Sequence, residues 1–138
     1  MRPLADIEGR LDALEAQGPG PGDAAELLAL GEEVLEHWVR ARGEEPTSGL
    51  REGFRLLALH LQGCNGVPSF NACRETCREL VYHYNLLGFE AGGEAATRQA
   101  RMMLLVTRHL YLFVSGKMQV EQLGEFCCSS RPLRQEAG

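Results

Sequence analysis

Residues 94–115 read EAATRQARMMLLVTRHLYLFVS and contain the most apolar run of the chain, from Met102 to Val114. Two glycines precede this stretch and Gly116 follows it, so the sequence predicts a helix bounded by glycines. The run is apolar nearly all round, and such a helix surface has to be covered on every side. We therefore expect this helix at the centre of the fold.

The segments before it have the same helical periodicity. Apolar residues recur at steps of three and four, and a glycine ends each segment. The predicted helices span about 23–43, 47–63 and 69–88. Asp23 followed by Glu26 is typical of a capping box at the start of the first, and Ser69 is the expected N-cap of the third. No segment alternates with a period of two, so no strand is predicted.

The two ends of the chain add shorter elements. Residues 1–17 form an amphipathic helix in this interpretation, 18–22 a Gly/Pro linker, 23–128 a helical bundle and 129–138 a polar tail. A last short helix is expected near 118–127. Short connections favour antiparallel neighbours, so the sequence predicts an all-α, up-down antiparallel bundle of four main helices with short accessory helices at both termini.

Charge and cysteine content limit the function classes. The chain has 14 Lys and Arg residues against 19 Asp and Glu residues, a formal charge of −5, with no cationic run for nucleic acid. No apolar stretch reaches the ~20 residues of a membrane span. Two acids within the first eight residues argue against a secretory signal, and five cysteines against a fully paired extracellular framework. We expect a cytoplasmic protein with free thiols.

One histidine falls on each predicted main helix. In an alternating bundle, His37 and His83 share one end and His60 and His109 the other. Glu33 precedes His37 by four residues and Glu79 precedes His83 by four. These pairs predict a two-Glu, two-His centre for a transition metal or haem, although di-iron bundles use a spacing of three. The alternative is a solvent-facing Glu–His contact on each helix.

Two cysteines lie one turn apart in the first turns of the predicted helix 69–88. The helix dipole at this position lowers the pKa of Cys73 and Cys77, and thiolates bind metals or take part in redox chemistry. Cys64, in the loop before this helix, and Cys127 and Cys128, in the terminal segment, are candidates to join them. Equally, Cys73 and Cys77 continue an apolar stripe, and free cysteine packs as a small hydrophobe. Both interpretations stay open.

No nucleotide-binding glycine motif and no catalytic spacing occurs, so an enzyme would have to be of unknown class. The chain has more apolar helix faces than a four-helix core needs, and Tyr82, His83 and Tyr84 cannot all point inward. We therefore predict a small accessory or regulatory protein that acts through contacts with a protein partner or as a homodimer. The expected contact residues are Leu4, Ile7, Leu11, Leu14 and Tyr82.

Overall fold

All regular structure in the described chain is helical. The computed structural model describes residues 2–89 and 92–123. The helices are α1 (Leu4–Gln17), α2 (Ala24–Ala41), α3 (Arg55–Gly63), α4 (Arg74–Phe89) and α5 (Gly93–Val120), with the 3₁₀ turns η1 (Pro21–Asp23) and η2 (Pro68–Cys73). No strand occurs within these ranges, so the all-α prediction is confirmed.

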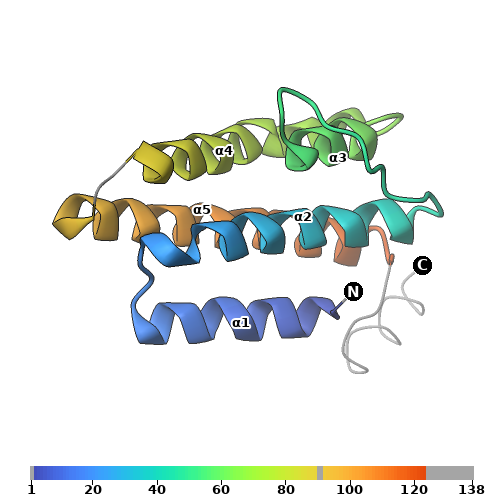
Figure 1. Ribbon diagram of the computed structural model, residues 1–138. Helices are drawn as coiled ribbons and strands as arrows, with labels where there is room; N and C mark the ends of the chain where they lie inside the picture. Colours follow the sequence, from blue (N-terminus) through green and yellow to red (C-terminus); the bar gives the residue numbers. More distant parts are fainter. Residues whose placement is uncertain (1, 90–91, 124–138) are drawn as a thin grey trace.

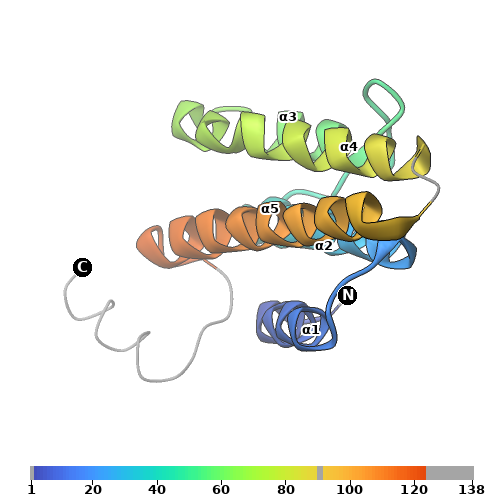
Figure 2. The ribbon, with the colours of Figure 1, turned by 90° about the vertical axis from the view of Figure 1, so that its left-hand side faces the viewer.

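The helices form three layers (Figures 1 and 2). α2 and α5 lie side by side in the middle, α3 and α4 cover one side of this pair, and α1 covers the other. α5 contacts α1, α2 and α4, as expected of a central helix. Its remaining face is exposed, however, so the expectation that it is covered on every side is wrong.

α2 and α5 run in the same direction. A Cβ atom at Gly31 of α2 would lie 3.6 Å from Leu110 of α5, and Lys117 further along α5 lies over the ring of Trp38. The residue nearer the start of α2 thus contacts the residue nearer the start of α5, as in a parallel pair of helices.

α3 is parallel to α2 as well. Arg55, at the start of α3, pairs with Glu32 and Glu36 in the middle of α2, whereas Gly63, at its end, contacts Trp38. The chain colours in Figure 1 agree with these directions. The predicted up-down alternation is therefore wrong between these helices.

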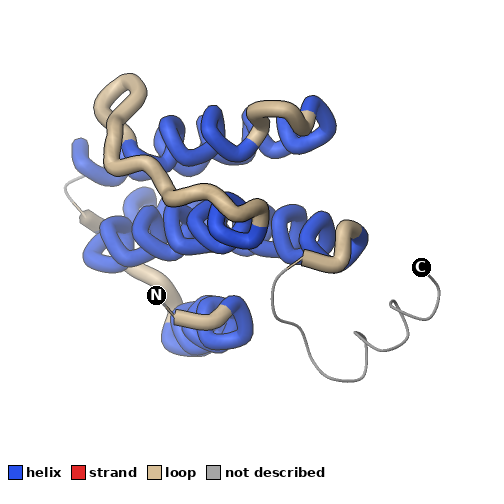
Figure 3. Tube along the Cα trace, turned by 90° about the vertical axis from the view of Figure 1, so that its right-hand side faces the viewer, coloured by secondary structure: helices blue, strands red, loops and turns tan. Residues whose placement is uncertain are grey.

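The connection between α2 and α3 explains this difference. The predicted helix start at Thr47 does not form. Residues 42–54 instead form a loop that connects the middle layer to the layer of α3 and α4 (Figure 3). Glu52 and Gly53 adopt left-handed φ angles of 54° and 85°, which an α-helix does not accommodate. The backbone N–H of Gly49 bonds to the Thr47 hydroxyl at 3.0 Å. Because the chain turns back before α3 begins, α3 repeats the direction of α2.

The start of α2 differs from its predicted capping box. Asp23 accepts a 2.9 Å hydrogen bond from the backbone N–H of Gly20 and makes no side-chain cap. Glu26 instead pairs with Arg10 of α1, with one nitrogen–oxygen distance of 2.8 Å. An ion pair between helices thus replaces the local motif.

The start of α4 and the end of α5 also differ from the predicted helix boundaries. The segment after Ser69 is first a 3₁₀ turn, and α4 begins only at Arg74. α5 continues through Gly116 to Val120, since one glycine inside a long packed helix costs only about 1 kcal/mol. The predicted last helix near 118–127 therefore begins inside α5, and its end, like the tail 129–138, lies outside the described residues.

Candidate functional site

The Glu–His pair of α2 contacts the start of the chain. The Glu33 carboxylate pairs with the guanidinium of Arg2 at 2.9 Å, and Nε2 of His37 donates a 2.7 Å hydrogen bond to the Arg2 carbonyl oxygen. Both side chains of this predicted metal pair are thus engaged with the segment that leads into α1.

The corresponding pair of α4 lies elsewhere. Nδ1 of His83 donates a 3.0 Å hydrogen bond to Oε1 of Gln99 on α5, and Glu79 is exposed. α2 and α4 run in opposite directions, so His37 and His83 lie toward opposite ends of the molecule (Figure 1). In residues 2–89 and 92–123, no three His, Cys, Asp or Glu side chains are placed to hold a metal ion. The predicted two-Glu, two-His centre for a metal or haem is therefore not formed.

Cys73 and Cys77 are both buried, as the apolar-stripe interpretation predicts. Both are free thiols, and Cys73 donates a 3.3 Å hydrogen bond from Sγ to the carbonyl oxygen of Phe70. Cys64 is only half-buried, and its thiol bonds separately to the carbonyl oxygen of Leu61. Cys127 and Cys128 lie outside the described residues. Of the three cysteines in residues 2–89 and 92–123, Cys73 and Cys77 thus lie together and Cys64 lies apart.

His60 of α3 completes this cluster. A hydrogen bond from Cys77 and the neighbouring imidazole of His60 lower the pKa of the Cys73 thiol to about 6, although burial acts in the other direction. The pKa of the Cys77 thiol is raised, because Cys77 forms this hydrogen bond to Cys73 and is itself buried. Such an arrangement favours one thiolate near neutral pH, which is the reactive form of cysteine. The burial of both sulfurs restricts that chemistry to reactants that reach the interior.

Sequence reasoning missed His60 because it grouped this residue with His109. The parallel course of α2 and α3 brings His60 instead to the junction of η2 and α4, where its ring lies 5.9 Å from that of Phe70. A signal was present: His60 follows Leu56 by four residues and Leu57 by three, which places it on the apolar face of α3.

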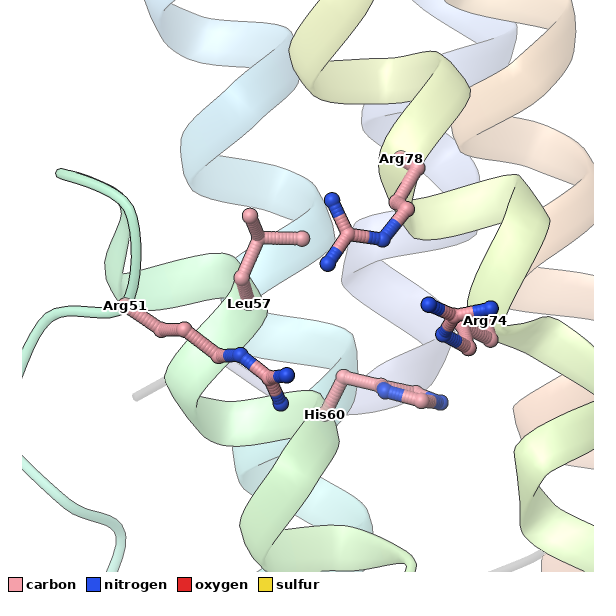
Figure 4. A pocket seen from close by; sticks show the side chains of 5 residues that line it. All are labelled: Arg51, Leu57, His60, Arg74 and Arg78. Atoms are coloured by element: carbon pink, nitrogen blue, oxygen red, sulfur yellow. The ribbon is translucent and has the colours of Figure 1, made fainter.

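A small pocket lies on the solvent side of His60. Its lining consists of Arg51, Leu57, His60, Arg74 and Arg78, and its volume is about 10 Å³. Figure 4 shows the three guanidinium groups grouped around the opening, with the imidazole of His60 extending toward Arg74. A cavity of this volume has room for about one water molecule.

The predicted contact residues of α1 are not on the surface. Leu4, Ile7, Leu11 and Leu14 are buried in the common core of the described chain. The prediction that they contact a partner is therefore wrong, because a short amphipathic helix gains most of its stability by burying its apolar face. Tyr82 of α4 is exposed, and its role in partner contact stays a prediction.

One apolar surface feature of the described chain is the outward face of α5. Its members are large apolar side chains with exposed fractions of 46% to 78%: Met102, Leu105, Leu112 and Val120. We call these four residues the α5 stripe. His109 is also exposed on this helix. Neither α1, α2 nor α4 covers the stripe, although all three pack against other faces of α5.

No described helix combines the length and hydropathy needed to cross a bilayer. Comparisons with protein-family models, with curated proteins and with solved structures give no match to this chain.

Proposed function

We propose that this protein is a small helical accessory or regulatory protein that acts through protein–protein contact, and that the α5 stripe is its contact surface. The observation that carries the proposal is the exposure of Met102, Leu105 and Leu112 on a helix whose other faces are packed. Apolar side chains concentrated on one helix face are typical of interaction sites, whereas scattered ones need no explanation.

The occupant that fits this face is a second copy of the chain. The exposed positions of α5 are spaced almost symmetrically about His109, so two antiparallel α5 helices can pair around that residue. In this register Met102 faces Gly116 of the other copy. No atom of the described residues lies within 4 Å of a Cβ position at Gly116, so the glycine leaves room for the longer side chain.

Charge supports the same register. Arg98 near the start of α5 then approaches Glu121, which follows its last residue, in the partner copy. Among the described residues of one chain these groups make only local pairs, Arg98 with Glu94 at 4.0 Å and Glu121 with Lys117 at 2.9 Å. The stripe from Met102 to Val120 extends over about 27 Å at the helical rise of 1.5 Å per residue. Flanking residues contribute the rest of the roughly 800 Å² that each partner of a stable interface buries.

Sedimentation equilibrium over a wide range of protein concentration tests this proposal. We expect a reversible dimer that Leu105→Glu weakens by about tenfold or more, because a charge is then buried at the interface. Leu61→Glu on α3 is the matched control, since Leu61 is exposed to nearly the same extent as Leu105. It should leave the dimer unchanged.

Gly116→Leu separates association from folding. Replacing a half-buried helical glycine raises helix propensity by about 1 kcal/mol, so the variant should unfold at a higher urea concentration. It should nevertheless dimerise more weakly, because the new side chain fills the space opposite Met102. A wild-type chain that stays monomeric at every concentration would rule out the second copy as occupant. Equal weakening by Leu61→Glu would show that the stripe is not the interface.

A further inference from the structure

Within residues 2–89 and 92–123, only cationic, imidazole and apolar side chains line the pocket beside His60. Its arginines come from two places: Arg51 from the turn before α3, and Arg74 and Arg78 from the first turns of α4. No carboxylate from the part of the chain that the structure describes contributes to the lining. Arg74 and Arg78 are four residues apart and so share one face of α4, near the end where the helix dipole is positive.

The turn that carries Arg51 has a defined geometry. Arg51 and Phe54 exchange two backbone hydrogen bonds, each 3.0 Å long, around the left-handed pair Glu52 and Gly53. The turn is thereby closed, and the Arg51 side chain reaches the pocket opening from the side opposite α4 (Figure 4).

Acidic neighbours neutralise these arginines only in part. Arg78 forms a two-bond ion pair with Glu52, at 2.8 and 3.2 Å, and Arg51 lies 3.9 Å from the same carboxylate. Arg74 has only a 3.4 Å contact with Glu75, whose side chain is highly exposed. Three guanidinium groups thus share two carboxylates, neither of which is among the lining residues, and this leaves an excess of one positive charge.

His60, which lines the same pocket, holds a buried nitrogen. His60 is 6% exposed, and its Nε2 has no hydrogen-bond partner in the described part of the chain. A buried polar atom without a partner costs about 1–3 kcal/mol, so a ligand that supplies an acceptor there is favoured. The volume of the pocket, about 10 Å³, matches a single ligand oxygen, so the rest of the ligand would stay at the opening.

We propose that this pocket binds a phosphate group, with Arg51, Arg74 and Arg78 as its charge partners and His60 Nε2 as the buried donor. A tetrahedral phosphate offers oxygens in several directions, as guanidinium groups converging from two elements require, and Arg forms two-bond contacts with phosphate. The ligand is either free inorganic phosphate or the phosphomonoester of a small molecule, since both offer the same oxygens.

Isothermal titration calorimetry at low ionic strength tests the site with inorganic phosphate and, separately, with glycerol phosphate. We expect saturable binding of one ligand per chain, weakened about tenfold or more in Arg78→Gln and His60→Gln. Arg98→Gln on α5 is the matched control, because Arg98 is exposed and far along the sequence from the pocket. Tighter binding of glycerol phosphate identifies a phosphomonoester ligand, and tighter binding of inorganic phosphate identifies the free ion.

Glu52→Gln gives the sharpest result, because it removes the carboxylate that competes for Arg78 and should therefore strengthen binding. A second measurement uses Cys73, which lies beside His60: a bound phosphate should raise the pH at which this thiol ionises. Thermal melts establish that the variants are folded. The proposal is overturned if no saturable binding occurs, if Arg98→Gln weakens binding as much as Arg78→Gln, or if Glu52→Gln weakens it.

Discussion

The indole Nε1 of Trp38 donates a 2.8 Å hydrogen bond to the carbonyl oxygen of Gly63, the last residue of α3. A Cβ atom at position 63 would lie 2.9 Å from Cδ1 of Trp38 and 2.9 Å from Cε2 of Phe70. These two rings are stacked with their centroids 4.5 Å apart, so neither can easily move aside. The ends of α2 and α3 can therefore approach this closely only at a residue without a side chain.

Gly63→Ala should consequently lower the free energy of unfolding by about 1–3 kcal/mol, the usual cost of overpacking a core. Urea denaturation measures the change. Gly9→Ala in α1 is the control: no described atom lies within 4 Å of a Cβ there, so this variant should gain up to about 1 kcal/mol of helix propensity. Equal stability of Gly63→Ala and the wild type would contradict the close approach.

The docking of α1 can be tested at Ile7, which is fully buried. Ile7→Ala should lower the free energy of unfolding by about 2–5 kcal/mol, because it removes buried apolar contacts and leaves a cavity. Leu112→Ala on the exposed face of α5 should change it by less than about 0.5 kcal/mol when measured at monomeric concentrations. If both variants unfold like the wild type, α1 is not part of the core.

The ion pair between Arg10 and Glu26 predicts a pH dependence. The hydrogen bond from Arg10 lowers the pKa of Glu26, so the stabilisation is present above the ordinary value of 4.5 and is lost as pH falls toward the folded value. Glu26→Gln should cost less than about 1 kcal/mol at neutral pH, since the pair is partly exposed.

Urea denaturation between pH 3 and 7 should find a constant difference between wild type and Glu26→Gln above pH 4.5 that shrinks below it. Glu75→Gln, in which a highly exposed carboxylate is changed, should differ little from wild type throughout. A difference that grows on acidification has the wrong sign for this ion pair.

The Cys73 thiol should ionise in the folded protein with a pKa of about 6. Thiolate absorbance near 240 nm, taken as the difference between wild type and Cys73→Ser, should rise with a midpoint near that pH. Cys77→Ala should move the midpoint upward, because it removes the hydrogen bond that contributes most to the shift. A wild-type midpoint near the ordinary value of 9 would contradict the arrangement.

The Cys73 thiol also makes the free energy of unfolding depend on pH above about 6. Between pH 6 and 9 the unfolded chain holds a proton on Cys73 that the folded chain has lost, so the pKa shift of this group makes unfolding harder as pH rises. In Cys73→Ser, the free energy of unfolding should increase less between pH 6 and 9 than it does in the wild type. A rise that is equally steep in the variant would assign it to other groups.

Most helices could be predicted from the sequence because their apolar periodicity and glycine boundaries are local features. The course of residues 42–54 could not, since a helix from Thr47 satisfies the same apolar pattern. The left-handed turn at Glu52 and the pairing of Arg55 with α2 decide the direction of α3, and both depend on tertiary contacts. That single connection accounts for the incorrect topology.

The same connection explains which site residues were predicted. The burial of Cys73 and Cys77 follows from the stripe on their own helix, so a local pattern was sufficient. Their neighbour His60 comes from another helix and depends on the direction of α3. The grouping of His37 with His83 assumed alternation between helices and failed for that reason. Residues that meet across elements are predictable only once the topology is known.

The parallel pairing of α2 and α5 has a consequence for synthesis of the chain. Gly31 and Trp38 of α2 meet their partners Leu110 and Lys117 only after nearly the whole sequence has been made. Until then, a chain emerging from the ribosome carries α2 with much of its apolar face uncovered. Contacts so distant in sequence slow folding, and exposed apolar surface favours aggregation. Completion of α5 should therefore be the step at which the nascent protein becomes resistant to protease.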